Sequence, residues 1–215
     1  MGRPRAVIFD FNGTLSQDEP ILCEIFMELF AEHGRPLSAQ EYFDELAGLS
    51  DPEVVRTWLG RDHADVDEVI EERIRRYRAA VGDGSSVPED LRAAARYAAE
   101  RVPLAVVSGA AREEIESVLE AAGIAHLFTA IVAAEDVPNG KPQPDGYRRA
   151  LQLLGEKLDA GEVLALEDTE AGIAAAKGAG MHCFAVLGTL APERLAQADE
   201  IVERIDVLLM ERLLG

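Results

Sequence analysis

The chain has 215 residues, of which 48% are hydrophobic and 28% are charged. This length suits one large domain, or one domain that carries a smaller insert, around a sizeable core. The formal net charge is −19, from 40 acidic residues against 21 Lys and Arg residues. Nucleic-acid backbones and anionic membranes attract clustered positive charge, so this balance argues against both as partners. An anionic ligand would need positive charge supplied locally, by a metal ion, a lysine or a helix N-terminus.

Targeting and redox features favour a cytoplasmic protein. The apolar runs are too short to cross a bilayer, and the first residues lack the long apolar stretch of a secretory signal. The two cysteines, Cys23 and Cys183, lie in apolar surroundings. We expect them to be buried thiols in a reducing compartment rather than a disulfide or a metal pair. The sequence does not indicate an oligomeric state.

Apolar runs rich in β-branched residues predict five buried strands, at 6–10, 104–108, 129–133, 163–167 and 183–187. Helical patterns lie between the later strands, at 89–100, 112–122, 146–154 and 172–180. Strands that alternate with helices indicate a parallel sheet with both faces covered. We therefore predict an α/β fold with a doubly wound, mostly parallel, five-stranded Rossmann-like sheet.

The segment between the first two strands departs from this alternation. Residues 17–81 contain no convincing strand but several amphipathic helical stretches, at 21–33, 39–46, 52–59 and 66–80. Residues 82–86 read Gly-Asp-Gly-Ser-Ser, which is typical of a flexible linker. We therefore expect a core domain of residues 1–16 and 82–215, with a helical cap of residues 17–81 inserted after the first strand as a lid.

Asp10 ends the first predicted strand. In open α/β sheets, ligands bind at the carboxyl edge of the strands, near the point where the strand order reverses. A functional carboxylate is therefore expected at this position. Asn12-Gly13 is, however, a strong hairpin signal, so that Asp10 could simply flank a type I′ turn. Taken alone, this stretch leaves both interpretations open.

Ser108 and Gly109 close the second strand and precede a helix. Free backbone N–H groups beside a small hydroxyl and a glycine form an oxyanion pocket, although a serine here also serves as an ordinary helix cap. Lys141 lies in a loop, where Pro142 favours an extended conformation at the lysine. A solvated loop lysine is the alternative.

Glu167 and Asp168 end the fourth strand, just before a predicted helix. The alternative to a functional role is that Asp168 or Thr169 simply caps this helix. The combination of these residues is more informative than any one of them. A carboxylate, a hydroxyl, a lysine and an acidic pair follow each other at one edge of the sheet. Such a set suits phosphoryl transfer, in which a carboxylate attacks phosphorus, carboxylates share Mg²⁺, and Ser and Lys hold the phosphoryl oxygens.

These motifs, in this order, resemble the haloacid dehalogenase superfamily over essentially the whole chain. Four stretches carry the resemblance to its motifs one to four: Asp-Phe-Asn-Gly-Thr at 10–14, Val-Val-Ser-Gly at 106–109, Lys-Pro at 141–142 and Glu-Asp-Thr-Glu-Ala-Gly-Ile at 167–173. The insert is similar to the helical cap of the phosphoglycolate phosphatase and β-phosphoglucomutase group. Residues 18–20, Asp-Glu-Pro, resemble the Ser-Glu-Pro that opens that cap.

The resemblance implies a role for each matching residue. Asp10 would be the nucleophile that forms an aspartyl-phosphate. The implied Mg²⁺ ligands are the Asp10 carboxylate, the main-chain carbonyl of Asn12 and Asp168, with Glu167 nearby. The implied phosphate-binding residues are Ser108, the amide of Gly109 and Lys141, with Thr14 in support. The substrate would be a small phosphorylated metabolite.

Two positions depart from the family pattern. Asn12 stands where phosphatases of the family carry a second aspartate as general acid and base, so hydrolysis is expected to be slow and Asn12→Asp to restore it. Asp51 stands where sugar phosphomutases carry a basic residue, which argues against a mutase. The leading prediction is a phosphoric monoester hydrolase. The alternative is a relative that has lost hydrolysis and binds a ligand or partner.

Two other features bear on function. A response-regulator receiver also combines an acceptor aspartate, a lysine and an acidic pair, but in a different order and without a large insert, which argues against it. The four histidines are not spaced in the sequence like the ligands of a metal site. We interpret them as surface or packing residues: His33, His63, His126 and His182.

Overall fold

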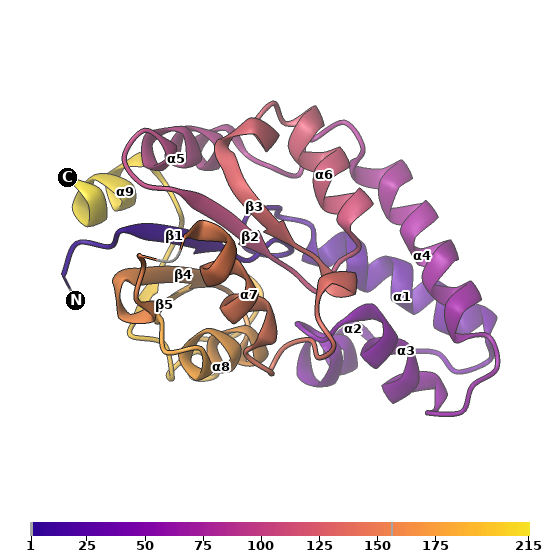
Figure 1. The fold of residues 1–215 in the computed structure, drawn as a ribbon. Helices are drawn as coiled ribbons and strands as arrows, with labels where there is room; N and C mark the ends of the chain where they lie inside the picture. The colour runs from indigo at the N-terminus through magenta and orange to yellow at the C-terminus, as the bar shows by residue number, and fades with distance from the viewer. Residues whose placement is uncertain (1, 156) are drawn as a thin grey trace.

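The computed structural model describes residues 2–155 and 157–215, so Met1 and Glu156 of the expected core domain lie outside it. Its centre is a parallel sheet of six strands in the order β3-β2-β1-β4-β5-β6 (Figure 1). The strands are β1 (Ala6–Phe9), β2 (Leu104–Val107), β3 (Phe128–Val132), β4 (Val163–Glu167), β5 (His182–Val186) and β6 (Glu200–Val202). The predicted fold class is confirmed. The five predicted strands are present within one residue, and the short edge strand β6 is added.

Helices cover both faces of the sheet (Figure 1). Successive side chains of a strand point to opposite faces, and β1 shows the consequence. Val7 and Phe9 pack with the helices of one face, whereas Ala6 and Ile8 pack with those of the other. The first face carries α5 (Glu89–Ala99), α6 (Arg112–Ala121) and α9 (Val207–Leu214), and the second carries α7 (Asp145–Leu154) and α8 (Glu170–Gly178). Short 3₁₀ turns occur at Ala125–Leu127, Ala134–Asp136 and Ala160–Glu162.

Residues 17–81 contain helices and no strand. The helices are α1 (Glu19–Glu32), α2 (Ala39–Glu41), a π-helical turn (Tyr42–Leu46), α3 (Asp51–Leu59) and α4 (Val66–Val81). The four predicted helical stretches are thus present, and the one at 39–46 is divided between α2 and the π-helical turn. Figure 1 shows this helical group beyond one end of the sheet, away from both termini. Whether it moves as a lid stays a prediction.

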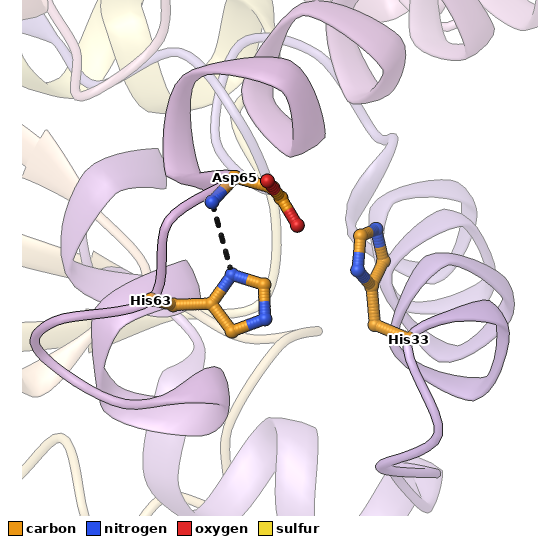
Figure 2. Close-up of side chains that lie close together, drawn as sticks. All are labelled: His33, His63 and Asp65. Carbon is orange, nitrogen blue, oxygen red and sulfur yellow. Dashed lines mark hydrogen bonds between the residues drawn. The ribbon is translucent and has the colours of Figure 1, made fainter.

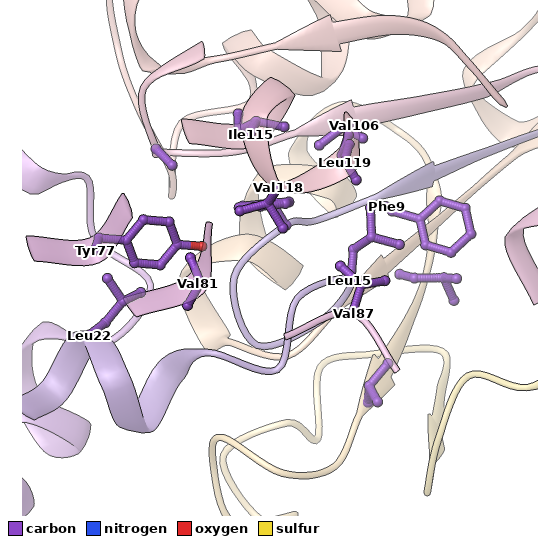
Figure 3. Packing of buried hydrophobic residues seen from close by; sticks show 14 of the residues in the cluster. Phe9, Leu15, Leu22, Tyr77, Val81, Val87, Val106, Ile115, Val118 and Leu119 are labelled. Atoms are coloured by element: carbon purple, nitrogen blue, oxygen red, sulfur yellow. The ribbon is translucent and has the colours of Figure 1, made fainter. Parts of the chain in front are cut away.

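The core is continuous from the sheet into the helical insert. Figure 3 shows Tyr77 and Val81 of α4 near Val118 of α6, in the same cluster as Phe9 of β1. The ring of Phe9 in turn meets the ring of Phe128 edge-on, with centroids 6.0 Å apart. Because one apolar cluster spans both parts, the insert packs directly against the sheet domain. Among the described helices, none is long and apolar enough to cross a membrane.

Candidate active site

The sheet brings the predicted site residues to one edge. β1 lies between β2 and β4, and the chain adds strands first on one side of β1 and then on the other. The carboxyl end of β1 is therefore the point where ligands bind in such sheets. Asp10 follows β1 directly and its N–H donates to Leu166 of β4 over 2.9 Å. Ser108 follows β2, and Glu167 is the last residue of β4.

A buried acidic cluster forms at this edge. Asp10, Glu167 and Asp168 each offer an oxygen atom within 4.8 Å of the others. Lys141 joins them: its Nζ contacts Asp10 Oδ1 and lies 2.6 Å from Glu167 Oε1. The lysine is 8% exposed. It is therefore part of the cluster, and the alternative of a solvated loop lysine is wrong.

Burial dominates the electrostatics of this cluster. It raises the pKa of Asp10, against the pull of Lys141, and raises the pKa of Glu167 to about 7. The pKa of Asp168 is raised well above its usual value by burial and then by the neighbouring charges of Asp10 and Glu167. Burial alone would lower the pKa of Lys141, but attraction to the two carboxylates raises it. Three acidic groups share one ammonium, so the cluster is short of positive charge, and its hard oxygen ligands fit Mg²⁺.

Sequence reasoning missed two residues that orient the acidic pair. Tyr147 of α7 is fully buried, and its hydroxyl donates to Glu167 Oε1. Thr189, in the loop after β5, donates to Asp168 Oδ2, while Thr14 Oγ1 donates to Asp168 Oδ1 over 3.3 Å. Thr189 could have been found from the sequence, because it is a polar residue in the loop that follows the fifth predicted strand. No spacing singled out Tyr147, which looks like a core residue of an amphipathic helix.

The turn after β1 is tight and is not a hairpin. Among the described residues, β1 pairs in parallel with β2 and β4 and with no antiparallel strand, so the hairpin interpretation of Asn12-Gly13 is wrong. Gly13 has a φ of +75°, and a Cβ there would lie 1.9 Å from Asp168 Oδ2. Glycine is needed at this position both for its backbone conformation and for the close approach of the carboxylate.

Two hydroxyl residues of the site, Thr169 and Ser108, differ in whether they cap a helix. Thr169 is the cap of α8, because its Oγ1 accepts the N–H of Gly172 over 3.2 Å. Ser108 does not cap a helix, although its Oγ accepts the N–H of Ala110 over 3.0 Å. Its hydroxyl lies 3.5 Å from Asn12 Oδ1. Ser108, Gly109 and Asn12 thus lie together beside the acidic cluster.

A small cavity lies between the site and the insert. It is lined by site residues of the sheet domain, such as Asp10 and Ser108, and by Glu19, Asp51 and Arg73 of the insert. Its volume is about 40 Å³, room for a few water molecules.

A second group of potential ligands lies on the outer side of the insert (Figure 2). His33, His63 and Asp65 each offer an atom within 4.8 Å of the others, a grouping that the sequence spacing did not reveal. His63 Nδ1 accepts the main-chain N–H of Asp65 over 3.3 Å. With Nδ1 used as an acceptor, His63 would have to bind a metal through Nε2. A histidine bound in that way normally donates a hydrogen bond through Nδ1, and here Nδ1 accepts one instead. We assign no metal to this group.

Comparison with known proteins agrees with the geometry. The model of the family described as haloacid dehalogenase-like hydrolase matches residues 7–186. The chain belongs to this family. Validoxylamine A 7'-phosphate phosphatase of Streptomyces hygroscopicus subsp. limoneus is 31% identical, in an alignment that covers 93% of each chain. Protein CbbY of Rhodobacter capsulatus is 29% identical, over 91% of this chain and 88% of that protein.

A solved structure supports the same assignment. The crystal structure of CbbY from Rhodobacter sphaeroides in complex with phosphate superposes with a TM-score of 0.81 and 27% identity, covering 94% of this chain and 95% of that one. The resemblance inferred from the four motifs is therefore confirmed, as is the prediction of a hydrolase of the haloacid dehalogenase family.

Proposed function

We propose that this haloacid dehalogenase-like hydrolase is a Mg²⁺-dependent phosphatase of a small phosphorylated metabolite, acting through an aspartyl-phosphate on Asp10. The observation that carries the proposal is the buried cluster of Asp10, Glu167 and Asp168 with Lys141 at the carboxyl edge of the sheet. The names of two relatives support it, since one is a phosphatase of a 7'-phosphate and another is a CbbY structure in complex with phosphate.

The chain's own residues supply most of the binding. The Asp10 carboxylate, the main-chain carbonyl of Asn12 and Asp168, with Glu167 close by, would hold Mg²⁺. The ion would neutralise charge on the phosphoryl oxygens. Lys141 provides a second positive charge beside the phosphoryl group. Ser108 and the N–H of Gly109 donate hydrogen bonds to the phosphoryl oxygens.

The reaction has two steps. A carboxylate oxygen of Asp10 attacks phosphorus, the ester P–O bond breaks, and the leaving alkoxide takes a proton from water. Water then attacks the phosphorus of the aspartyl-phosphate and the bond to Asp10 breaks. The carboxylate is regenerated, and the protons of the water leave with inorganic phosphate or pass to solvent. Asn12 neither gives a proton in the first step nor accepts one in the second. Since general acid–base catalysis contributes roughly 10²–10⁴-fold, esters with poor leaving groups should react slowly by about that factor.

The insert favours a substrate with a single phosphate. Residues 17–81 hold 16 Asp and Glu against 7 Lys and Arg. Of the charged residues that the insert adds to the cavity, Glu19 and Asp51 are acidic, and Arg73 is paired with Asp51 at 3.4 Å. Among these residues a second phosphate would find no unpaired cation, whereas hydroxyl or amine groups would find acceptors.

One observation favours a second function. Asn12 removes the proton-transferring group but leaves the acidic cluster and Lys141 in place. A protein with these features could bind a phosphorylated ligand, or stay phosphorylated, without efficient hydrolysis. In that case phosphate would bind and turnover would be absent.

The test is release of inorganic phosphate from a broad set of phosphorylated metabolites with Mg²⁺, for wild type and Asp10→Asn. Asp67→Asn is a matched control, because Asp67 is an exposed aspartate in the first turn of α4. Wild type and the control should hydrolyse at least one ester, and Asp10→Asn none. Mass spectrometry after treatment with acetyl phosphate should place a phosphoryl group on Asp10. Hydrolysis that survives in Asp10→Asn would refute the mechanism.

A further inference from the structure

Asp18 is a fully buried carboxylate beside the proposed site. It occupies the N-cap position of α1, where an aspartate usually accepts a helix N–H, yet its side chain makes no capping hydrogen bond. Its oxygens receive three other donors. Asn12 Nδ2 lies 3.1 Å from Oδ2, the N–H of Gly13 lies 3.3 Å from Oδ1, and the hydroxyl of Tyr77 donates to Oδ2. The side chain is therefore directed to the turn after β1 and not to its own helix.

This contact decides which end of the Asn12 amide faces the site. An amide has a donor end and an acceptor end, and the hydrogen-bond network determines how they point. The carboxylate of Asp18 accepts, so it holds the NH₂ end. The carbonyl end then faces Ser108, whose Oγ lies 3.5 Å from Asn12 Oδ1. Position 12 thus offers the cavity an acceptor.

We propose that Asp18 is the positioning residue for Asn12, holding its carbonyl oxygen toward the phosphoryl site. This inference rests on the proposed function. An acceptor here orients the hydrogen of an attacking water in the second step. It gives nothing to the leaving oxygen in the first step, which needs a donor. The pair therefore favours esters whose leaving groups depart without a proton.

The same contact makes residues 12 and 18 interdependent. An aspartate at position 12 would place two carboxylates in contact inside the protein. Among the described residues, none of the hydrogen bonds to Asp18 comes from Lys or Arg to offset that repulsion. Asn12→Asp alone, which the sequence predicted would restore hydrolysis, should therefore not restore it. With Asp18→Asn added, donor and acceptor exchange places and the pair is satisfied again.

The experiment compares wild type, Asn12→Asp, Asp18→Asn and the double variant, each with Mg²⁺. Asn12→Asp should unfold about 5 °C or more below wild type and gain less than about tenfold on an alkyl phosphate. The double variant should recover most of the unfolding temperature and gain about 10²-fold on the same ester. Mass spectrometry of the peptide around Asn12-Gly13 confirms that the amide is intact in wild type.

Asn12→Asp with Asp65→Asn is the matched control, because Asp65 is also an N-cap aspartate without a capping bond, but is exposed. It should not rescue. If Asn12→Asp alone is as stable and as active as the double variant, Asp18 does not set the role of residue 12 and the inference is overturned. If no protein hydrolyses any ester, the proposed function fails, and the unfolding temperatures decide the inference by themselves. The inference is supported if the change in the double variant differs from the sum of the changes in the two single variants, and it is refuted if the changes are additive.

Discussion

Arg73 of α4 offers a sharp test of how the insert is joined to the sheet domain. Its side chain is 2% exposed and lies between Asp51 of α3, at 3.4 Å, and Glu114 of α6, which it contacts directly. Its guanidinium also lies over the ring of Tyr77, 5.0 Å from the centroid. Within the described residues, its Nε has no hydrogen-bond partner. The arginine is thus a buried ion-pair link between the two parts of the molecule.

Replacing Arg73 with methionine keeps an apolar stem but leaves Asp51 and Glu114 without their cation. Removing one partner of a buried pair costs about 3–5 kcal/mol. For a chain of this size, each kcal/mol lowers the unfolding temperature by about 2–4 °C, so the drop should be about 6–20 °C. Burial raises the pKa of Glu114 to about 7, against the effect of Arg73. Protonation of Glu114 should therefore relieve part of the loss at pH 6 compared with pH 8.

Thermal and urea unfolding of the metal-free protein measure the effect. The matched control is Arg75→Met on the same helix, since Arg75 is 69% exposed and pairs with Glu72 at the surface, where such pairs contribute about 0–1 kcal/mol. Adding Glu114→Gln to Arg73→Met should recover part of the loss, because one of the two unpaired charges is then gone. If Arg73→Met costs no more than Arg75→Met, the buried link does not hold the insert to the core.

Three further outcomes are expected. Asp168→Asn should lower Mg²⁺ affinity at least about tenfold in titration calorimetry, and unchanged affinity would remove Asp168 from the metal site. Trp58, the single tryptophan, is buried in the insert. If the insert moves as a lid, vanadate binding with Mg²⁺ should change the fluorescence of Trp58. Fluorescence that stays constant up to saturation with vanadate contradicts the lid. In EDTA, the free energy of unfolding should fall as pH rises from 5 to 8, because burial raises the pKa of Glu19 to about 8 and of Glu167 to about 7. The folded state then binds more protons than the unfolded state over this range, and urea titrations that show a rise would refute it.

The sheet and the acidic cluster could be predicted because their signals are local. A buried parallel strand needs a continuous apolar run, and the runs that end at Asp10 and Glu167 are of this kind. The polar residue after such a run must lie at the carboxyl edge, whatever the strand order. Lys141 lies far from Asp10 in sequence, and its place at this edge was inferred from the order of the polar residues along the chain and from the family motif, not from a local pattern.

Other features depend on contacts that no local pattern encodes. The strand β6 is three residues long, and α9 follows it closely, so neither left a clear signal. Tyr147 carries the same apolar periodicity as any core residue, and its hydroxyl contact with Glu167 comes from the packing of α7 on the sheet. In the sequence, Asp18 was noted only as part of residues 18–20, which resemble the start of the helical cap. Its role toward Asn12 depends on the backbone turn at Gly13, which brings the side chains together.

The pair of Asn12 and Asp18 also determines which measurement separates the two candidate functions. Mg²⁺ binding needs the carboxylates of the acidic cluster and a main-chain carbonyl at position 12, which an asparagine supplies as well as an aspartate. Formation of a phosphoenzyme from an activated donor needs Asp10 as nucleophile and Lys141 as the positive charge, and no proton for the leaving group. Both properties are therefore expected of a phosphatase and of a ligand-binding relative alike. Turnover of an alkyl phosphate is different, because its leaving oxygen must take a proton. Slow but measurable alkyl phosphate hydrolysis in wild type, faster in the Asn12→Asp, Asp18→Asn double variant, is the result that favours the phosphatase.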